Sequence, residues 1–167
     1  MPAIGVATAK GLCYSLDKPM ISVPTLKSMA FGIWQLTTDS KQSIAGKNIL
    51  ICPMIDARRM EVYCSLFDTG MNEVRETKAE VIEESSFSDL LTDHAIIFAG
   101  EGASKCKKTL EKNKNAIFPD DFQASAKYMV SFAEYKYANN VFENIAYFEP
   151  FYLKDFIAGK PRVKGLD

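Results

Sequence analysis

The stretch "NILICPMIDARRMEVYCSLFDTGMNEVRETKAEVI", residues 48–82, carries the pattern that decides the fold. It contains three runs rich in β-branched and aromatic residues, at 48–55, 61–68 and 73–82, and such runs are typical of strands. The connections between them, "DARRM" and "TGMN", have the length of hairpin turns. The stretch therefore predicts an antiparallel meander of three strands.

Helices and strands alternate after the meander. The sequence predicts a short helix that Ser85 or Ser86 caps and that carries Phe87, Leu90 and Leu91. It then predicts a strand in "HAIIFAG", a helix capped by Ser104, a short strand in "NAIFP" and a longest helix over 121–138. A meander followed by alternating helices and strands builds the mixed sheet of the ribonuclease H-like fold. The predicted class is α/β, with three layers and a mixed sheet.

Two helices are predicted before the meander. Residues 3–16 are rich in Ala and Gly and end before Pro19, which stops a helix. Thr25 can cap a second helix, whose apolar residues recur on one face until about Thr37. We expect this second helix to face the core.

Composition places the chain among ordered globular proteins. Its 167 residues are 47% hydrophobic and 25% charged, enough for one well-buried core. Twenty Lys and Arg face 21 Asp and Glu, so no overall basic field gathers nucleic acid. No apolar run reaches the roughly 18 residues of a membrane span, and Lys10 interrupts the apolar start, unlike in a signal peptide. We expect a cytoplasmic protein with no membrane contact.

Cysteine and histidine are too sparse for the common metal sites. The four cysteines (Cys13, Cys52, Cys64 and Cys106) form no CxxC motif, and His94 is the single histidine. This pattern excludes the usual zinc motifs and favours free thiols in a reducing compartment. No catalytic set of Ser, Cys and His is visible either, so no metal and no catalytic residue are predicted.

The turn between the first two predicted strands has the residue types of a phosphate site without its glycines. Asp56, Arg58, Arg59 and Glu61 lie there, and the Arg58 guanidinium can hold a carboxylate or phosphate bidentately. We interpret the turn as a polar contact surface. The alternative is that Asp56 and Arg58 satisfy each other or the nearby backbone, while Glu61 is a solvated strand start.

A second weak signal for nucleotide binding lies in "FAGEGASK". Gly100 and Gly102 stand between a predicted strand and a helix, where backbone amides can receive a sugar or phosphate. The alternative is a tight strand-to-helix turn, which a lone GxG fits equally well. Together with Asp56 and Arg58, these glycines form the candidate nucleotide-binding set.

Several segments together resemble the TsaB family, also called YeaZ. They are "IGVATAKGL" (4–12), "KPMISVPTL" (18–26), "IDARRMEVY" (55–63) and "EPFYLK" (149–154), in the family's order and spacing. The resemblance implies the actin and Hsp70 type of ribonuclease H-like fold. It also implies a non-catalytic role in making threonylcarbamoyladenosine at position 37 of tRNAs that decode ANN codons, with TsaD and the ATPase TsaE as partners. An older name for such proteins is glycoprotease, or peptidase family M22.

The resemblance also implies a division of the chain. Family members carry a strand-rich segment and "GPGSFTGLR" before the match to "IGVATAKGL", so we interpret the sequence as N-terminally truncated. Residues 1–44 are then a helical remnant of the first half, 45–150 the complete second half, and 151–167 a tail returning toward the first half.

Partners and ligands follow from the same resemblance. The first helix is implied to pair with TsaD or with a second copy in a homodimer, and its interface candidates are Gly5, Val6, Ala9, Leu12 and Cys13. The alternative is internal packing of this helix. The family has no cofactor of its own, allows an adenine nucleotide at the interface with TsaD, and reaches tRNA only indirectly through the complex.

Three hypotheses for function remain from the sequence. The first is a scaffold that activates TsaD. The second is a nucleotide-dependent hydrolase or glycoprotease-like enzyme of the actin-like superfold, which would use Asp56 and the Gly100 turn. The third is a self-associating fragment without activity.

Overall fold

The computed structural model describes residues 2–39, 48–120 and 122–153. In chain order its elements are α1 (Pro2–Ser15), α2 (Thr25–Asp39), β1 (Asn48–Asp56), β2 (Glu61–Phe67), β3 (Glu73–Val81), α3 (Leu90–Asp93), β4 (His94–Ala99), α4 (Glu101–Leu110), β5 (Ala116–Ile117), the 3₁₀ helix η1 (Ala126–Met129) and α5 (Val130–Ala138). From residue 48 onward, strands and helices follow the predicted order.

The sheet is mixed, with the strand order β3-β2-β1-β4-β5. β1 and β2 pair antiparallel, as do β2 and β3, which confirms the meander. β4 joins β1 in parallel, and β5 joins β4 in parallel through the crossover helix α4. β1 is the third of the five strands, so it is the central strand, and it has an antiparallel neighbour on one side and a parallel neighbour on the other.

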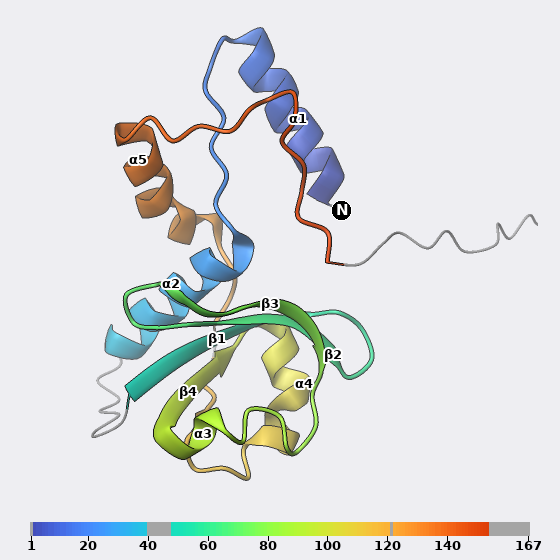
Figure 1. Cartoon of the computed structure of the whole chain (residues 1–167), viewed down its shortest axis with the longest axis vertical. Coiled ribbons are helices and arrows are strands. Elements are labelled where there is room, and N and C mark those ends of the chain that lie inside the picture. Colours follow the sequence, from blue (N-terminus) through green and yellow to red (C-terminus); the bar gives the residue numbers. More distant parts are fainter. Residues whose placement is uncertain (1, 40–47, 121, 154–167) are drawn as a thin grey trace, which may run out of the picture.

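Apolar side chains fill both faces of the sheet. On one face, Cys52 and Met54 of β1 pack with Phe98 of β4 and with α4. On the other, Ile51 of β1 packs against Met29 and other residues of α2. Figure 1 shows α2 and α4 on opposite sides of the strands. The predicted α/β class, three layers and core-facing second helix are therefore confirmed.

Three predicted helix boundaries are wrong. α3 begins at Leu90, so neither Ser85 nor Ser86 caps it, and Phe87 lies before it with a φ of 63°. α4 begins at Glu101, so Ser104 lies inside it and does not cap it. The region 121–138 is not one helix: Ser125 is extended and its Oγ accepts from the Lys127 backbone N–H, so η1 and then α5 begin after it. The sequence predicted one helix with a continuous apolar face over 121–138. In the structure, Tyr128 is buried in η1, and the regular helix begins only after it.

The predicted division at residue 44 lies outside the described residues, as does most of the predicted tail over 151–167. α2 packs on β1 in the same core as the sheet. The domain boundaries stay a prediction. Among the described residues, no helix combines the length and the apolar character that crossing a bilayer requires.

Candidate functional site

α1 lies apart from the sheet, beside the chain segment 140–153 (Figure 1). Over residues 4–15, every residue is half-buried or exposed. The Lys10 ammonium, from the middle of α1, donates to the carbonyl oxygens of Ala146 at 3.3 Å and Phe148 at 3.0 Å. A helix of 14 residues gains little stability from propensity alone. α1 therefore depends on the surfaces against which it packs.

The five predicted interface residues of α1 lie on two sides of the helix. Val6, Ala9 and Cys13 are half-buried and share a side with Lys10, whereas Gly5 and Leu12 are exposed on the neighbouring side. Leu12 is 56% exposed. Packing within this chain thus partly buries Val6, Ala9 and Cys13. Gly5 and Leu12 are open to a partner. The interface itself stays a prediction.

Large apolar side chains gather on α1 and the segment beside it, which together we call the α1 lobe (residues 2–16 and 140–153). Its exposed apolar residues are Ile4, Leu12, Tyr14, Leu16, Val141, Phe142, Tyr147, Phe151 and Tyr152. Isolated exposed apolar residues are ordinary in soluble proteins, but a gathering of this size on two adjacent segments is typical of an interaction surface.

Polar contacts connect the α1 lobe to α5. Glu143 forms an antiparallel bridge with Met20, and its backbone N–H donates to the Met20 carbonyl oxygen at 2.8 Å. The Glu143 carboxylate accepts from the Ser22 hydroxyl and pairs with Lys136 at 3.5 Å. Lys136 also donates to the Ser22 carbonyl oxygen at 2.8 Å. Hydrogen bonds, an ion pair and an edge contact between the Phe142 and Tyr137 rings thus hold the lobe to the rest of the chain.

The turn after β1 is organised by a lysine from α4. Asp56 Oδ1 accepts from the Arg58 backbone N–H at 2.7 Å and pairs with the Lys105 ammonium. Lys105 Nζ also donates to the carbonyl oxygens of Arg59 and Glu61, each at 2.7 Å. Asp56 therefore meets the nearby backbone, as the alternative interpretation held, but its ionic partner is Lys105 and not the Arg58 guanidinium.

Sequence reasoning missed Lys105. It lies 49 positions from Asp56, and no motif marks it among the other lysines of its helix. The two meet because α4 follows β4, which pairs in parallel with β1 and so brings the helix to the same end of the sheet. Only the strand order could have indicated this contact.

The Asp56 carboxyl should make stability depend on pH. The hydrogen bond from Lys105, followed by the Arg58 backbone N–H, lowers the pKa of Asp56 below its usual value. A lowered folded-state pKa stabilises the protein above the unfolded-state value of about 4, and this contribution disappears as pH falls through the folded-state pKa. We expect Asp56→Asn to lower the urea midpoint modestly at pH 7 and by less at acidic pH.

Urea unfolding of both proteins at pH 7 and about pH 3 checks this prediction. Asp120→Asn is the control. The Asp120 carboxylate is 90% exposed, and its ion pair with Lys107 is long, at 3.8 Å, so it should contribute little to stability. It should leave the midpoint unchanged at both pH values. Equal effects of Asp56→Asn at the two pH values would contradict the prediction.

Gly100 and Gly102 allow α4 to approach β1 closely. Gly100 has a φ of 106°, and a Cβ atom there would lie 2.5 Å from the Met54 carbonyl oxygen. A Cβ on Gly102 would lie 3.0 Å from the Ile55 carbonyl carbon and from Val62 Cγ1. Both glycines therefore have a packing role in the strand-to-helix turn, which is the alternative that the sequence left open.

A family model described as "TsaD: tRNA N6-adenosine threonylcarbamoyltransferase" matches residues 3–160, nearly the whole chain. The chain belongs to the TsaD family. This membership supports a role related to tRNA modification, and the family description names a transferase. No curated protein matches the chain.

Two solved structures from Pseudomonas aeruginosa share the fold of this TsaD-family chain. An uncharacterized protein with similarity to peptidase YEAZ has a TM-score of 0.69 at 19% identity, covering 91% of this chain and 67% of its own. YeaZ itself has a TM-score of 0.60 at 16% identity, covering 90% of this chain and 67% of its own. The resemblance to the TsaB (YeaZ) type and the ribonuclease H-like, actin-like fold are confirmed.

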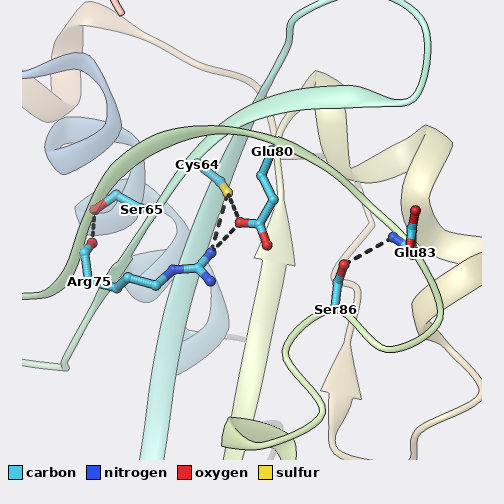
Figure 2. Close-up of polar contacts among 6 residues, drawn as sticks. All are labelled: Cys64, Ser65, Arg75, Glu80, Glu83 and Ser86. Atoms are coloured by element: carbon cyan, nitrogen blue, oxygen red, sulfur yellow. Dashed lines mark hydrogen bonds and ion pairs between the residues drawn. The ribbon is translucent and has the colours of Figure 1, made fainter.

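A further polar cluster of this TsaD-family chain lies on β2 and β3 (Figure 2). Arg75 and Glu80 form an ion pair at 2.8 Å, and each lies 3.6 Å from Cys64 Sγ. The Arg75 guanidinium also lies 4.4 Å from the centre of the Phe87 ring. The pair therefore covers the edge of the apolar core at β3. Cys64 is buried beneath it, in agreement with its interpretation as a core thiol.

Metal ligation finds no support in this part of the TsaD-family chain. Within residues 2–39, 48–120 and 122–153, no three His, Cys, Asp or Glu side chains lie together as a metal site needs. His94 begins β4, as predicted, with Nδ1 3.2 Å from the Leu90 carbonyl oxygen. All four cysteines are free, and burial raises the pKa of the Cys52 thiol well above its ordinary value.

The candidate nucleotide-binding set is brought together at one end of the sheet, but apart from the exposed Arg58 side chain its groups are already engaged. Asp56 is paired with Lys105, the two glycines pack against β1, and the acidic Glu101 lies in the first turn of α4. An acidic first turn and a paired carboxylate do not fit a phosphate group. Asp56, Gly100 and Gly102 therefore do not form a phosphate cradle within this chain. An adenine nucleotide at a subunit interface stays a prediction.

Proposed function

We propose that this protein is a non-catalytic scaffold subunit that pairs with TsaD and activates threonylcarbamoyl transfer to adenosine 37 of tRNAs that decode ANN codons. The observation that carries the proposal is α1, a helix without a buried side chain over residues 4–15. Such a helix needs a partner surface, and its neighbours in the α1 lobe are apolar. The membership of the TsaD family supplies the class of reaction.

The composition of the lobe fits a protein partner. Interface centres are enriched in aromatic residues, and the lobe exposes Tyr14, Tyr147, Phe151 and Tyr152. Gly5 has no atom of another segment near the place of a Cβ, so a partner helix can approach its backbone. We place the TsaD contact on Gly5 and Leu12, with Val6, Ala9 and Cys13 supporting the helix from its half-buried side.

The other parts of the proposal follow from the same role. TsaE would join the complex as its ATPase, tRNA would be reached through the assembled complex, and the protein would act in the cytoplasm. An adenine nucleotide would be bound between this chain and TsaD and not by this chain alone. A second copy of the chain competes with TsaD for the same lobe.

The test of the proposed function is a binding and reconstitution experiment. Leu12→Glu places a charge on the proposed interface, and Val74→Glu places the same charge on the edge strand β3. The exposures are matched, at 56% and 55%, so both variants should fold equally well. We expect Leu12→Glu to weaken binding to TsaD by about 30- to 100-fold, the cost of losing a central apolar contact. Val74→Glu should have little effect.

Tryptophan fluorescence or calorimetry gives the affinity, and formation of threonylcarbamoyladenosine with TsaD and TsaE gives the activity. Wild-type chain that neither binds TsaD nor stimulates modification would overturn the proposal. Light scattering distinguishes one rival: a stable homodimer that Leu12→Glu dissociates, without any TsaD binding, would make the lobe a self-association surface.

A further inference from the structure

The turn after β1 has a backbone conformation that its residues do not favour. Arg58 and Arg59 have φ values of 73° and 50°, both in the left-handed region. Consecutive positive φ values in a hairpin turn are usually supplied by Asn-Gly, Asp-Gly or Gly-Gly. Side chains of L-residues crowd the backbone in this region. Two adjacent arginines are therefore an unfavourable choice for the turn itself.

The backbone of this turn is satisfied without any ligand. The Glu61 N–H donates to the Arg58 carbonyl oxygen at 3.2 Å, and the Ala57 N–H donates to the Glu61 carbonyl oxygen at 3.1 Å. The Arg58 N–H donates to Asp56, and the Arg59 carbonyl accepts from Lys105. The structure therefore explains the shape of the turn through its backbone and through Asp56 and Lys105, and it gives no internal reason for arginine at 58 and 59.

The two arginine side chains are exposed and have no partner among residues 2–39, 48–120 and 122–153. Throughout the part of the chain that the structure describes, neither guanidinium has a hydrogen bond, an ion pair or an aromatic ring beside it. The carboxylate of the turn, Asp56, is already neutralised by Lys105. The turn therefore presents two positive charges that have no partner among the described residues. Strained residues that the fold does not require are a sign of function.

We propose that Arg58 and Arg59 form a phosphate-binding tip that contacts the RNA backbone. Guanidinium groups bind phosphate bidentately, and a nucleic acid strand offers a phosphate at every nucleotide, so two adjacent arginines fit two successive phosphates. RNA is favoured over an acidic protein surface because the matching family model is that of a tRNA-modifying enzyme. The inference rests on the proposed function and goes beyond it, since the chain itself would touch the tRNA.

The test replaces both arginines by glycine. Glycine accepts positive φ without strain, so the Arg58→Gly, Arg59→Gly variant should fold with an unchanged or higher Tm. Unmodified tRNA transcript is titrated with the chain alone and with the chain plus TsaD, at several salt concentrations. We expect about tenfold weaker binding at moderate salt. The plot of log affinity against log salt should be flatter by nearly one for each lost phosphate contact.

Two matched variants distinguish phosphate binding by Arg58 and Arg59 from the general attraction of RNA to exposed positive side chains. Lys108→Ala, Lys114→Ala removes the same charge from exposed positions in α4 and the loop after it, and tRNA affinity should change by less than about twofold. Arg58→Lys, Arg59→Lys keeps the charge and loses the planar fork, so part of the affinity should return.

Several outcomes would overturn the inference. Unchanged tRNA affinity in the glycine variant is one, and an equal loss in the Lys108 and Lys114 variant is another. Loss of TsaD binding with unchanged tRNA affinity of the chain alone would instead place the tip against carboxylates of a protein. Wild-type chain that binds no tRNA, alone or with TsaD, would also overturn it. Absence of TsaD binding would contradict the proposed function and is measured separately. In that case, the tRNA titration of the chain alone still tests whether Arg58 and Arg59 bind RNA.

Discussion

Gly100→Ala is expected to destabilise the protein by about 3–5 kcal/mol, the combined cost of backbone strain and overpacking. Gly100 joins β4 to α4 with φ 106° and ψ 174°, a region that only glycine adopts readily. An added Cβ would lie 2.5 Å from the Met54 carbonyl oxygen and 2.8 Å from Met29 Cε. The methionine side chain can move, but the carbonyl belongs to the central strand and cannot.

Urea unfolding followed by circular dichroism measures this loss. Gly11→Ala is the control, because Gly11 is exposed in α1 and no atom lies within 4 Å of the place of its Cβ. Alanine favours a helix over glycine, so this variant should be as stable as the wild type or more stable, by up to about 1 kcal/mol. A Gly100→Ala protein that unfolds within about 1 kcal/mol of wild type would show that the turn can rearrange.

Phe98→Ala should cost about 3–5 kcal/mol, as large-to-small changes at buried aromatic positions do. Phe98 is completely buried in β4. Its ring lies 5.2 Å from Phe87 at an edge angle of 63°, and 5.3 Å from Phe118 in a stacked arrangement. Phe87 has a φ of 63°, a conformation that its burial against Phe98 helps to hold. The loss of unfolding free energy should therefore be larger than the removed apolar surface area alone would account for.

Phe142→Ala is the matched control for Phe98→Ala. Phe142 is 40% exposed in the α1 lobe and takes no part in either core cluster. Its removal should change the free energy of unfolding by less than about 1 kcal/mol. Comparable losses for the two variants would mean that the sheet core can close around the missing Phe98 ring.

The sequence was sufficient to predict the meander because its determinants are local. β-branched and aromatic residues alternate with short turns over 48–82, and each hairpin joins neighbouring strands. The helix over 121–138 could not be predicted correctly, since it depends on a distant contact. Tyr128 packs against Gly32 of α2 and interrupts the amphipathic pattern with a 3₁₀ turn.

The candidate site was predictable in its residue types but not in its pairing. Asp56, Arg58 and Arg59 are visible as a charged turn in the sequence. The partner of Asp56 is Lys105, which reaches it only through the parallel pairing of β1 and β4. Arginine has no local preference for positive φ, so the strain at 58 and 59 is set by the turn and cannot be read from residue type.

The exposure of α1 also affects how the protein would recognise its partner. A helix that buries no side chain over residues 4–15 contributes little to the global free energy of unfolding, so it can open locally while the sheet stays intact. Part of the interaction energy with a proposed partner would then be spent on ordering the helix. Recognition through α1, as proposed, would therefore be coupled to its folding. This coupling would give moderate affinity for the area buried and would let the complex dissociate without unfolding of the sheet.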